Sequence, residues 1–148
     1  MKVVIQRVRH ASVTIDNEVY NKIDKGFLLL VGITDGDTEE IVEKVANKVV
    51  DLRIFDDAEG KMNLGIEEVG GTILSISQFT LYGDCKKGRR PSFITAARPE
   101  ISKPLYEKFN EVCARRVETK PGIFGAEMLI DLCNDGPITI VIDSKDIL

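Results

Sequence analysis

The residues best suited to chemistry in this chain lie in two short polar segments that are far apart in the sequence. The first places two hydroxyls and an amide within four positions, and the second is a compact group of turn-forming residues. Both adjoin apolar runs typical of β-strands, where polar groups would not be placed for packing alone. The residues are Ser77, Gln78, Phe79 and Thr80 in the first segment, and Asn134, Asp135, Gly136 and Pro137 in the second.

A Ser or Thr nucleophile needs a base to remove its proton, and this chain offers little choice of base. The single histidine, His10, is expected on a surface turn between two strands, so no Ser-His-Asp set can be assembled around it. No spaced pair of carboxylates indicates glycosidase-like or metal-assisted chemistry, and no glycine-rich nucleotide-binding loop is present. We therefore predict that the protein uses no cofactor and no metal.

The cysteines give a second, weaker option. Their number, three, is odd and no C-x-x-C spacing occurs, which argues against a disulfide framework or a zinc site. Cys113 and Cys133 are expected in a helix and a strand, where cysteine usually acts as a small buried side chain. Cys85 lies beside a basic run, so a thiol-dependent hydrolase that uses Cys85 stays open as an alternative.

Length and composition indicate what kind of domain carries these sites. At 148 residues, of which 43% are hydrophobic, the chain is long enough to form one domain with its own core, and we assign residues 1–148 to a single domain. Met1 is followed at once by Lys2, unlike a secretory signal, and no apolar run reaches the length of a membrane span. We expect a cytoplasmic protein in a reducing compartment, with no membrane partner.

Charge is unevenly distributed along the chain. The net charge is −4, yet four cations occur within five positions at Lys86, Lys87, Arg89 and Arg90. Such a run is most often a solvated loop, but it can also hold one segment of a phosphate backbone. A non-catalytic RNA-binding module is therefore the main alternative to an enzyme, although the chain lacks a dense basic face and an aromatic stacking motif.

The β-strands expected from apolar runs and alternation outnumber the helices. Residues 27–33 are apolar on both faces, which predicts a central buried strand. Asp16 and Asn17 predict a hairpin turn, and 134–137 predict a turn between two antiparallel strands. The other strands are expected at 3–8, 11–15, 19–23, 71–76, 126–133 and 138–142.

Two helices are expected. Asp37 and Glu40 resemble a capping box ahead of an apolar helical face over residues 41–49. The second helix is expected to follow Ser102, with Pro104 in its first turn. The fold predicted from these elements is α+β: a curled antiparallel or mixed sheet that forms a barrel-like core, with two helices packed outside it.

Taken in order, these segments closely resemble the D-aminoacyl-tRNA deacylase family. Each matching run is weak alone, but the ordered set is specific and extends over nearly the whole chain. One departure is Gly65, where the family pattern has a larger polar residue, but it lies outside the proposed site. The matching runs are 6–8 with 11–13, 52–55, 60–64, 77–81, 88–93, 124–126 and 134–137.

The resemblance implies a homodimer with a barrel-like fold that binds the acceptor end of aminoacyl-tRNA. It would hydrolyse the ester between a D-amino acid and the terminal adenosine. The Gly136-Pro137 bond would be cis and would reach into the partner's active site, where it excludes L-amino acids. Arg7 is similar to the residue that braces that loop.

The resemblance also assigns the opposite wall of the site. Ser77, Gln78, Phe79 and Thr80 would form that wall, with backbone N–H groups placed for the substrate and the developing oxyanion. Phe124 and Gly125 resemble the segment that receives the adenine.

A site of this kind could work without a protein base. The vicinal 2′-OH of the terminal ribose can activate the ester, so the protein would chiefly position the carbonyl and stabilise the oxyanion. Thr80 as a covalent nucleophile is the competing mechanism. Exclusion by rigid backbone would leave D side chains unread, and glycine, which has no side chain, could not be rejected, so mischarged glycyl-tRNA would also be a substrate.

Overall fold

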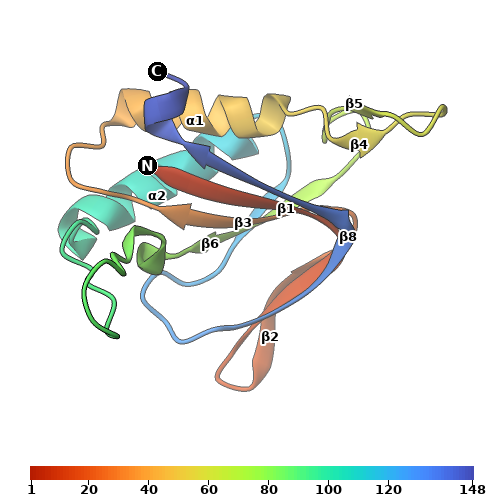
Figure 1. The fold of residues 1–148 in the computed structure, drawn as a ribbon. Coiled ribbons are helices and arrows are strands. Elements are labelled where there is room, and N and C mark those ends of the chain that lie inside the picture. The colour runs from red at the N-terminus through yellow and green to blue at the C-terminus, as the bar shows by residue number, and fades with distance from the viewer.

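The computed structural model describes all 148 residues, and two helices lie on one side of a strongly curved sheet (Figure 1). The helices are α1 (Glu39–Asp51) and α2 (Pro99–Ala114), and two short 3-10 helices are η1 (Phe79–Tyr82) and η2 (Ser144–Asp146). No helix is both long and apolar enough to cross a membrane. The strands are β1 (Lys2–Ile15), β2 (Glu18–Ile23), β3 (Gly26–Gly32), β4 (Phe55–Asp56), β5 (Met62–Leu64), β6 (Thr72–Ser77), β7 (Thr119–Pro121) and β8 (Leu129–Asp143).

The main sheet has the order β2-β1-β3-β6-β7, and β8 pairs with β1. The pairs of β3 with β6 and of β6 with β7 are parallel, while β1 pairs antiparallel with β2, β3 and β8. Side chains link the two ends of this order, since Asn21 Nδ2 donates to the Pro121 carbonyl at 2.7 Å and Lys120 Nζ donates to the Lys22 carbonyl at 3.0 Å. The predicted mixed, barrel-like sheet with two outer helices is confirmed.

The central strand β3 is buried on both faces, as its sequence predicts. Phe27 and Leu29 belong to the larger core, which fills the space between the sheet and the two helices. Leu28 belongs to a smaller core inside the curve of the sheet, with Leu74 and Ile76 of β6. Because successive side chains of a strand point to opposite faces, one apolar run supplies both cores.

The turn predicted at 134–137 is wrong. β8 is a single strand, and both of its halves pair antiparallel with β1, as the partners Ile5↔Ile140 and Val13↔Ile130 show. The register shifts on either side of Val8, so residues 135–138 leave the ladder as a bulge. Residues that favour turns also favour bulges, and a long continuous β1 supplies partners on both sides of this one. The same continuity corrects His10, which is exposed but lies within β1 and not in a turn.

The predicted capping box at Asp37 is also wrong. Thr38 is the N-cap of α1, and its hydroxyl accepts from the Ile41 N–H at 3.2 Å. Asp37 stays outside the helix because other donors engage its carboxylate. These are the Thr34 N–H at 2.9 Å and the N-terminal ammonium of Met1, also at 2.9 Å.

The second helix begins earlier than its sequence pattern predicts. Pro99 occupies the first turn, and Pro104 is inside the helix. Proline removes one helical hydrogen bond, the one that the Glu100 carbonyl would accept. Glu100 and Pro104 are both exposed, so water can replace the missing donor. An internal proline is therefore tolerated on the solvent face.

Replacing Gly26 by alanine is expected to disrupt the parallel pairing of β3 with β6. A Cβ at Gly26 would lie 1.7 Å from the Thr72 carbonyl oxygen, which is backbone and cannot move aside alone. We expect Gly26→Ala to lower the free energy of unfolding by about 3 kcal/mol or more in thermal or denaturant unfolding. Gly65→Ala is the matched control, because its Cβ would have no neighbour nearer than 3.6 Å. Equal stability of the two variants would contradict this packing.

Candidate functional site

A pocket of about 550 Å³ lies at the carboxyl ends of β3 and β6. Because these strands are parallel and in register, with Val31 beside Ser77, their ends meet at one edge of the sheet. Ligand sites commonly form at such edges. The first turns of α2 and residues 124–130 complete the walls. Of the 17 lining residues 12 are hydrophobic, so the pocket suits a largely apolar ligand with few polar contacts.

The first polar segment forms one wall of this pocket. Ser77 ends β6, Gln78 precedes η1, and Phe79 begins it; all three line the pocket. The Gln78 N–H is bonded to the Val31 carbonyl at 2.8 Å, whereas the N–H groups of Phe79 and Thr80 have no partner within the chain. Two adjacent free donors at the start of a turn can bind a carbonyl oxygen or an oxyanion.

Thr80 itself is not part of the pocket lining. Its side chain is exposed, and its hydroxyl accepts a hydrogen bond from the Gln78 amide. No histidine, carboxylate or amine is bonded to that hydroxyl. The local geometry therefore offers no base to activate Thr80 as a nucleophile.

The opposite wall contains Phe124 and Gly125, as the resemblance implies for an adenine-binding segment. Phe124 packs against Tyr106 of α2, with 6.1 Å between ring centroids. Gly125 has φ of +78°, a left-handed conformation that favours glycine. The structure thus brings Phe124 and Gly125 together with Ser77, Gln78 and Phe79 around one cavity.

Tyr106 is the only titratable residue in the lining, and sequence reasoning missed it as a pocket residue. Burial raises the pKa of its phenol, and the hydroxyl donates to the Ser75 carbonyl at 2.6 Å. A phenol in this state stays protonated near neutral pH and cannot act as a general base. The helical spacing of Ser102, Tyr106 and Phe109 was the available signal, but it looks like ordinary core packing.

Phe93 also lines the pocket and was missed. It meets Phe79 edge to face at the mouth, with 5.2 Å between centroids and 75° between the ring planes. Both rings are unusually open for phenylalanine, with exposures of 39% and 59%. Two exposed aromatic rings at a pocket mouth provide surfaces on which a base or an aromatic side chain can stack.

The second polar segment lies away from this pocket in the same chain. The Gly136-Pro137 bond is cis, and both residues are exposed in the bulge of β8. The bulge is opposite Arg7, which pairs with Phe27 at the start of β3, whereas Ser77 pairs with Val31 near the end of β3. Phe27 and Val31 are four residues apart on β3, so the bulge and Ser77 are separated by about 13 Å along the strand direction. One chain alone does not bring the bulge to the pocket.

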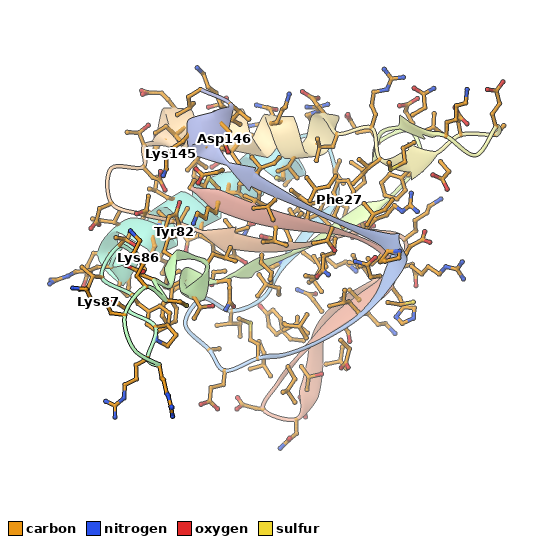
Figure 2. All side chains as sticks on the ribbon, viewed as in Figure 1. Phe27, Tyr82, Lys86, Lys87, Lys145 and Asp146 are labelled. Carbon is orange, nitrogen blue, oxygen red and sulfur yellow. The ribbon has the colours of Figure 1, made fainter.

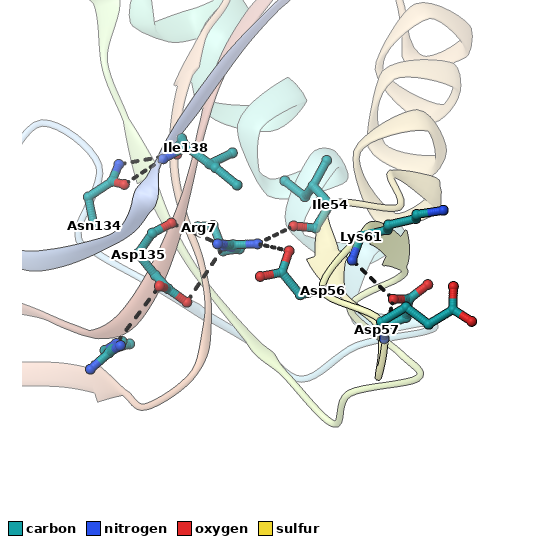
Figure 3. A network of polar contacts seen from close by, with 10 residues as sticks. Arg7, Ile54, Asp56, Asp57, Lys61, Asn134, Asp135 and Ile138 are labelled. Carbon is teal, nitrogen blue, oxygen red and sulfur yellow. Dashed lines mark hydrogen bonds and ion pairs between the residues drawn. The ribbon is translucent and has the colours of Figure 1, made fainter.

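Arg7 links the bulge to the β4–β5 hairpin (Figure 3). Its side chain is buried, and its Nε donates to the Asp135 carbonyl at 3.1 Å. Its NH1 donates to the Ile54 carbonyl at 2.7 Å and to the Asp56 carboxylate at 3.3 Å. A buried guanidinium with three acceptors fixes the backbone just before Gly136.

Asn134 closes the other side of the bulge (Figure 3). Its Oδ1 accepts from the Ile138 N–H at 2.7 Å, and its Nδ2 donates to the Ile138 carbonyl at 3.1 Å. The side-chain amide thus repeats the paired bonds that a neighbouring strand would make. Together, Arg7 and Asn134 hold the exposed Gly136-Pro137 unit from both ends.

The thiols lie outside the pocket. Cys85 is exposed on the loop before Phe93, and Cys113 is buried in α2. Burial raises the pKa of the Cys113 thiol to about 12, so it stays protonated at neutral pH. No group of three His, Cys, Asp or Glu side chains is arranged to hold a metal ion.

Comparison with solved structures supports the fold. The chain superimposes on a structure named c-Myc DNA Unwinding Element Binding Protein with a TM-score of 0.91 and 37% identity, covering 97% of this chain and 98% of the other. A probable eukaryotic D-amino acid tRNA deacylase aligns with a TM-score of 0.80, covering 95% and 97% of the two chains. Its identity of 19% supports likeness of fold alone.

Sequence comparison gives the family. The model of the family described as D-Tyr-tRNA(Tyr) deacylase matches residues 4–143. The D-aminoacyl-tRNA deacylase of Brevibacillus brevis is 57% identical over 97% of this chain and 100% of its own. The enzyme of the same name from Thermus aquaticus is 52% identical over 99% and 97%. With such identity held over nearly the full length of both chains, the chain belongs to the D-Tyr-tRNA(Tyr) deacylase family and is a D-aminoacyl-tRNA deacylase.

Proposed function

We propose that this deacylase hydrolyses the ester of D-aminoacyl-tRNA in the pocket at the ends of β3 and β6, with the terminal 2′-OH of the tRNA assisting. The observation that carries the proposal is a pocket whose lining holds one titratable residue, a phenol that burial keeps protonated. Ester hydrolysis there needs an activating group from elsewhere, and the vicinal ribose hydroxyl is held beside the carbonyl by the substrate itself.

In this mechanism the enzyme mainly positions the ester and stabilises charge. The free N–H groups of Phe79 and Thr80 would bind the carbonyl oxygen and strengthen their bonds as it becomes an oxyanion. Ser77 and Gln78 would fix the aminoacyl group, and Phe124 and Gly125 would receive the adenine. Thr80 would act through its backbone, since nothing near its hydroxyl could accept the proton.

Discrimination against L-amino acids would come from a second copy of the chain. The Gly136-Pro137 unit is exposed and is braced from both sides. It lies about 13 Å along the direction of β3 from the pocket of its own chain, so it suits insertion into a partner's pocket. β8 is also an edge strand, with Leu129 and Val141 exposed at 69% and 64%. Long apolar edges are normally covered, and a homodimer would cover this one.

A rigid backbone unit in the partner's pocket would clash with an L side chain and leave a D side chain pointing outward. This steric exclusion would depend on the configuration at the α-carbon of the amino acid and not on the identity of its side chain. We propose that one domain spanning residues 1–148 performs this reaction on the acceptor end of aminoacyl-tRNA in the cytoplasm.

The first test compares D-tyrosyl-tRNA and L-tyrosyl-tRNA, each with a normal terminal ribose. We expect rapid release of the D-amino acid only. A D-tyrosyl-tRNA with a 2′-deoxy terminus should react at least about 100-fold more slowly, since the activating hydroxyl is absent. Binding of the deoxy substrate should be little changed, which separates loss of activation from loss of affinity. Equal rates for the ribose and deoxyribose substrates would refute substrate assistance and favour a protein nucleophile.

Glycyl-tRNA is expected to be hydrolysed as well. Glycine has no side chain to meet the excluding backbone, so its ester enters the pocket as a D-aminoacyl ester does. The measurement is release of glycine from glycyl-tRNA at enzyme concentrations that clear D-tyrosyl-tRNA. Alanyl-tRNA with L-alanine is the control, because a single methyl group should restore rejection. Intact glycyl-tRNA under these conditions would show that glycine is rejected by some other contact.

Asn134→Ala is expected to weaken chiral discrimination more than catalysis. The substitution removes the amide that pairs with Ile138, so the Gly136-Pro137 unit can shift and admit L substrates. We expect the ratio of D to L rates to fall by about ten-fold, equivalent to ~1.4 kcal/mol. Asn47→Ala is the control, since Asn47 also makes side-chain hydrogen bonds but lies on α1. An unchanged ratio in an Asn134→Ala protein that remains dimeric by sedimentation would argue against this role of the bulge.

A further inference from the structure

Residues 84–92 form a loop with a fixed base and a strongly basic tip. Asp84 and Ser92 pair as an isolated antiparallel bridge, with N–H to carbonyl distances of 2.7 and 2.9 Å. The Asp84 carboxylate accepts from the Lys86 N–H at 2.9 Å, which orders the start of the turn. Lys86, Lys87, Arg89 and Arg90 are all exposed.

These four cations have no ionic partner in the protein. By contrast, Arg115 is paired with Glu43 and Glu111, and Arg116 is paired with Asp51 and Glu67. Asp84 is the only acid between residues 83 and 98, and its carboxylate bonds to backbone. Like charges this close repel one another, so the loop favours a multivalent anion over any part of its own chain.

The loop is attached directly to the pocket. It leaves η1 after Tyr82 and ends at Phe93, which lines the pocket mouth and packs on Phe79. In Figure 2, Lys86 and Lys87 lie at the same end of the molecule as Tyr82, far from Phe27 at the Arg7 end of β3. A nucleic acid whose terminal nucleoside occupies the pocket would therefore have the basic loop close to it.

We propose that Lys86, Lys87, Arg89 and Arg90 bind backbone phosphates of the nucleotides that adjoin the terminal aminoacyl-adenosine of the substrate. This inference rests on the proposed function, because it places the terminal nucleoside in the pocket. The loop contributes affinity and capture without sequence selectivity, since phosphate contacts position a nucleic acid but do not read its bases. It also explains how a protein of net charge −4 binds RNA at this one end.

The test compares two double variants with the same change of charge. Lys86→Gln/Lys87→Gln alters the loop, and Lys44→Gln/Lys48→Gln alters two exposed lysines without ion pairs on α1. On D-tyrosyl-tRNA the loop variant should raise KM about ten-fold with kcat unchanged. The negative slope of log(kcat/KM) against log salt concentration should become shallower by about 1.4, because each of the two lost phosphate contacts on a single strand contributes ~0.7. The α1 variant should match the wild type in both measurements.

A second substrate separates this inference from the proposed function. D-tyrosyl-adenosine carries the same ester but no phosphate, so wild type and loop variant should hydrolyse it equally. Failure of the wild type to hydrolyse either ester would contradict the proposed function. Binding of uncharged tRNA, measured by fluorescence anisotropy, then still tests the loop, since weaker binding by the loop variant alone supports it. Equal binding and equal KM for the loop and α1 variants would overturn it.

Discussion

The parallel pairing of β3 with β6 is the constraint on which the rest of the molecule depends. It puts the ends of two buried strands at one edge, and the free N–H groups of η1 follow directly from the end of β6. It also requires β3 to be covered on both faces, which the helices do on one side and the curve of the sheet on the other. The pocket is therefore formed by backbone geometry before any particular side chain is considered.

This dependence on backbone geometry explains why the pocket lining needs so few reactive side chains. Backbone donors are lost only when the residue becomes proline, do not titrate and are oriented by the strand that precedes them. A substrate that brings its own hydroxyl needs little more than such donors and apolar walls. Under the proposed mechanism such a pocket would serve different amino acids, because no contact in it depends on the identity of the amino-acid side chain.

Much of the fold could be predicted from the sequence, because alternation and double-sided burial leave clear patterns. The apolar run at 27–33 and the helical face at 41–49 correspond to β3 and α1. The errors arose where long-range partners decided between local options. Asp37 has the composition of a cap but is drawn to the Met1 ammonium, and Asn134 to Pro137 look like a turn until β1 supplies pairing on both sides. Neither partner can be inferred from local spacing.

The pocket could be predicted only in part, for a related reason. The polar groups of Ser77 and Gln78 stand out in the sequence itself, and Phe124 and Gly125 were predicted through the ordered resemblance. Tyr106 and Phe93, in contrast, look like ordinary apolar positions. Their contribution depends on which face of α2 meets the sheet and where the basic loop returns. Both are set by tertiary packing.

The bond from Arg7 to Asp135 has a consequence for how the sequence of the bulge can vary. Arg7 holds the carbonyl oxygen of Asp135, an atom that every amino acid provides, while the Asp135 carboxylate makes only looser ion pairs at 3.6 and 3.8 Å. The side chain at position 135 can therefore change without releasing the bulge. Asn134, in contrast, is needed for its side-chain amide, and Gly136 has φ of +135°, a conformation that favours glycine. The side chain of residue 135 is thus free to vary while its backbone stays in place, because Arg7 binds the main chain and not the side chain.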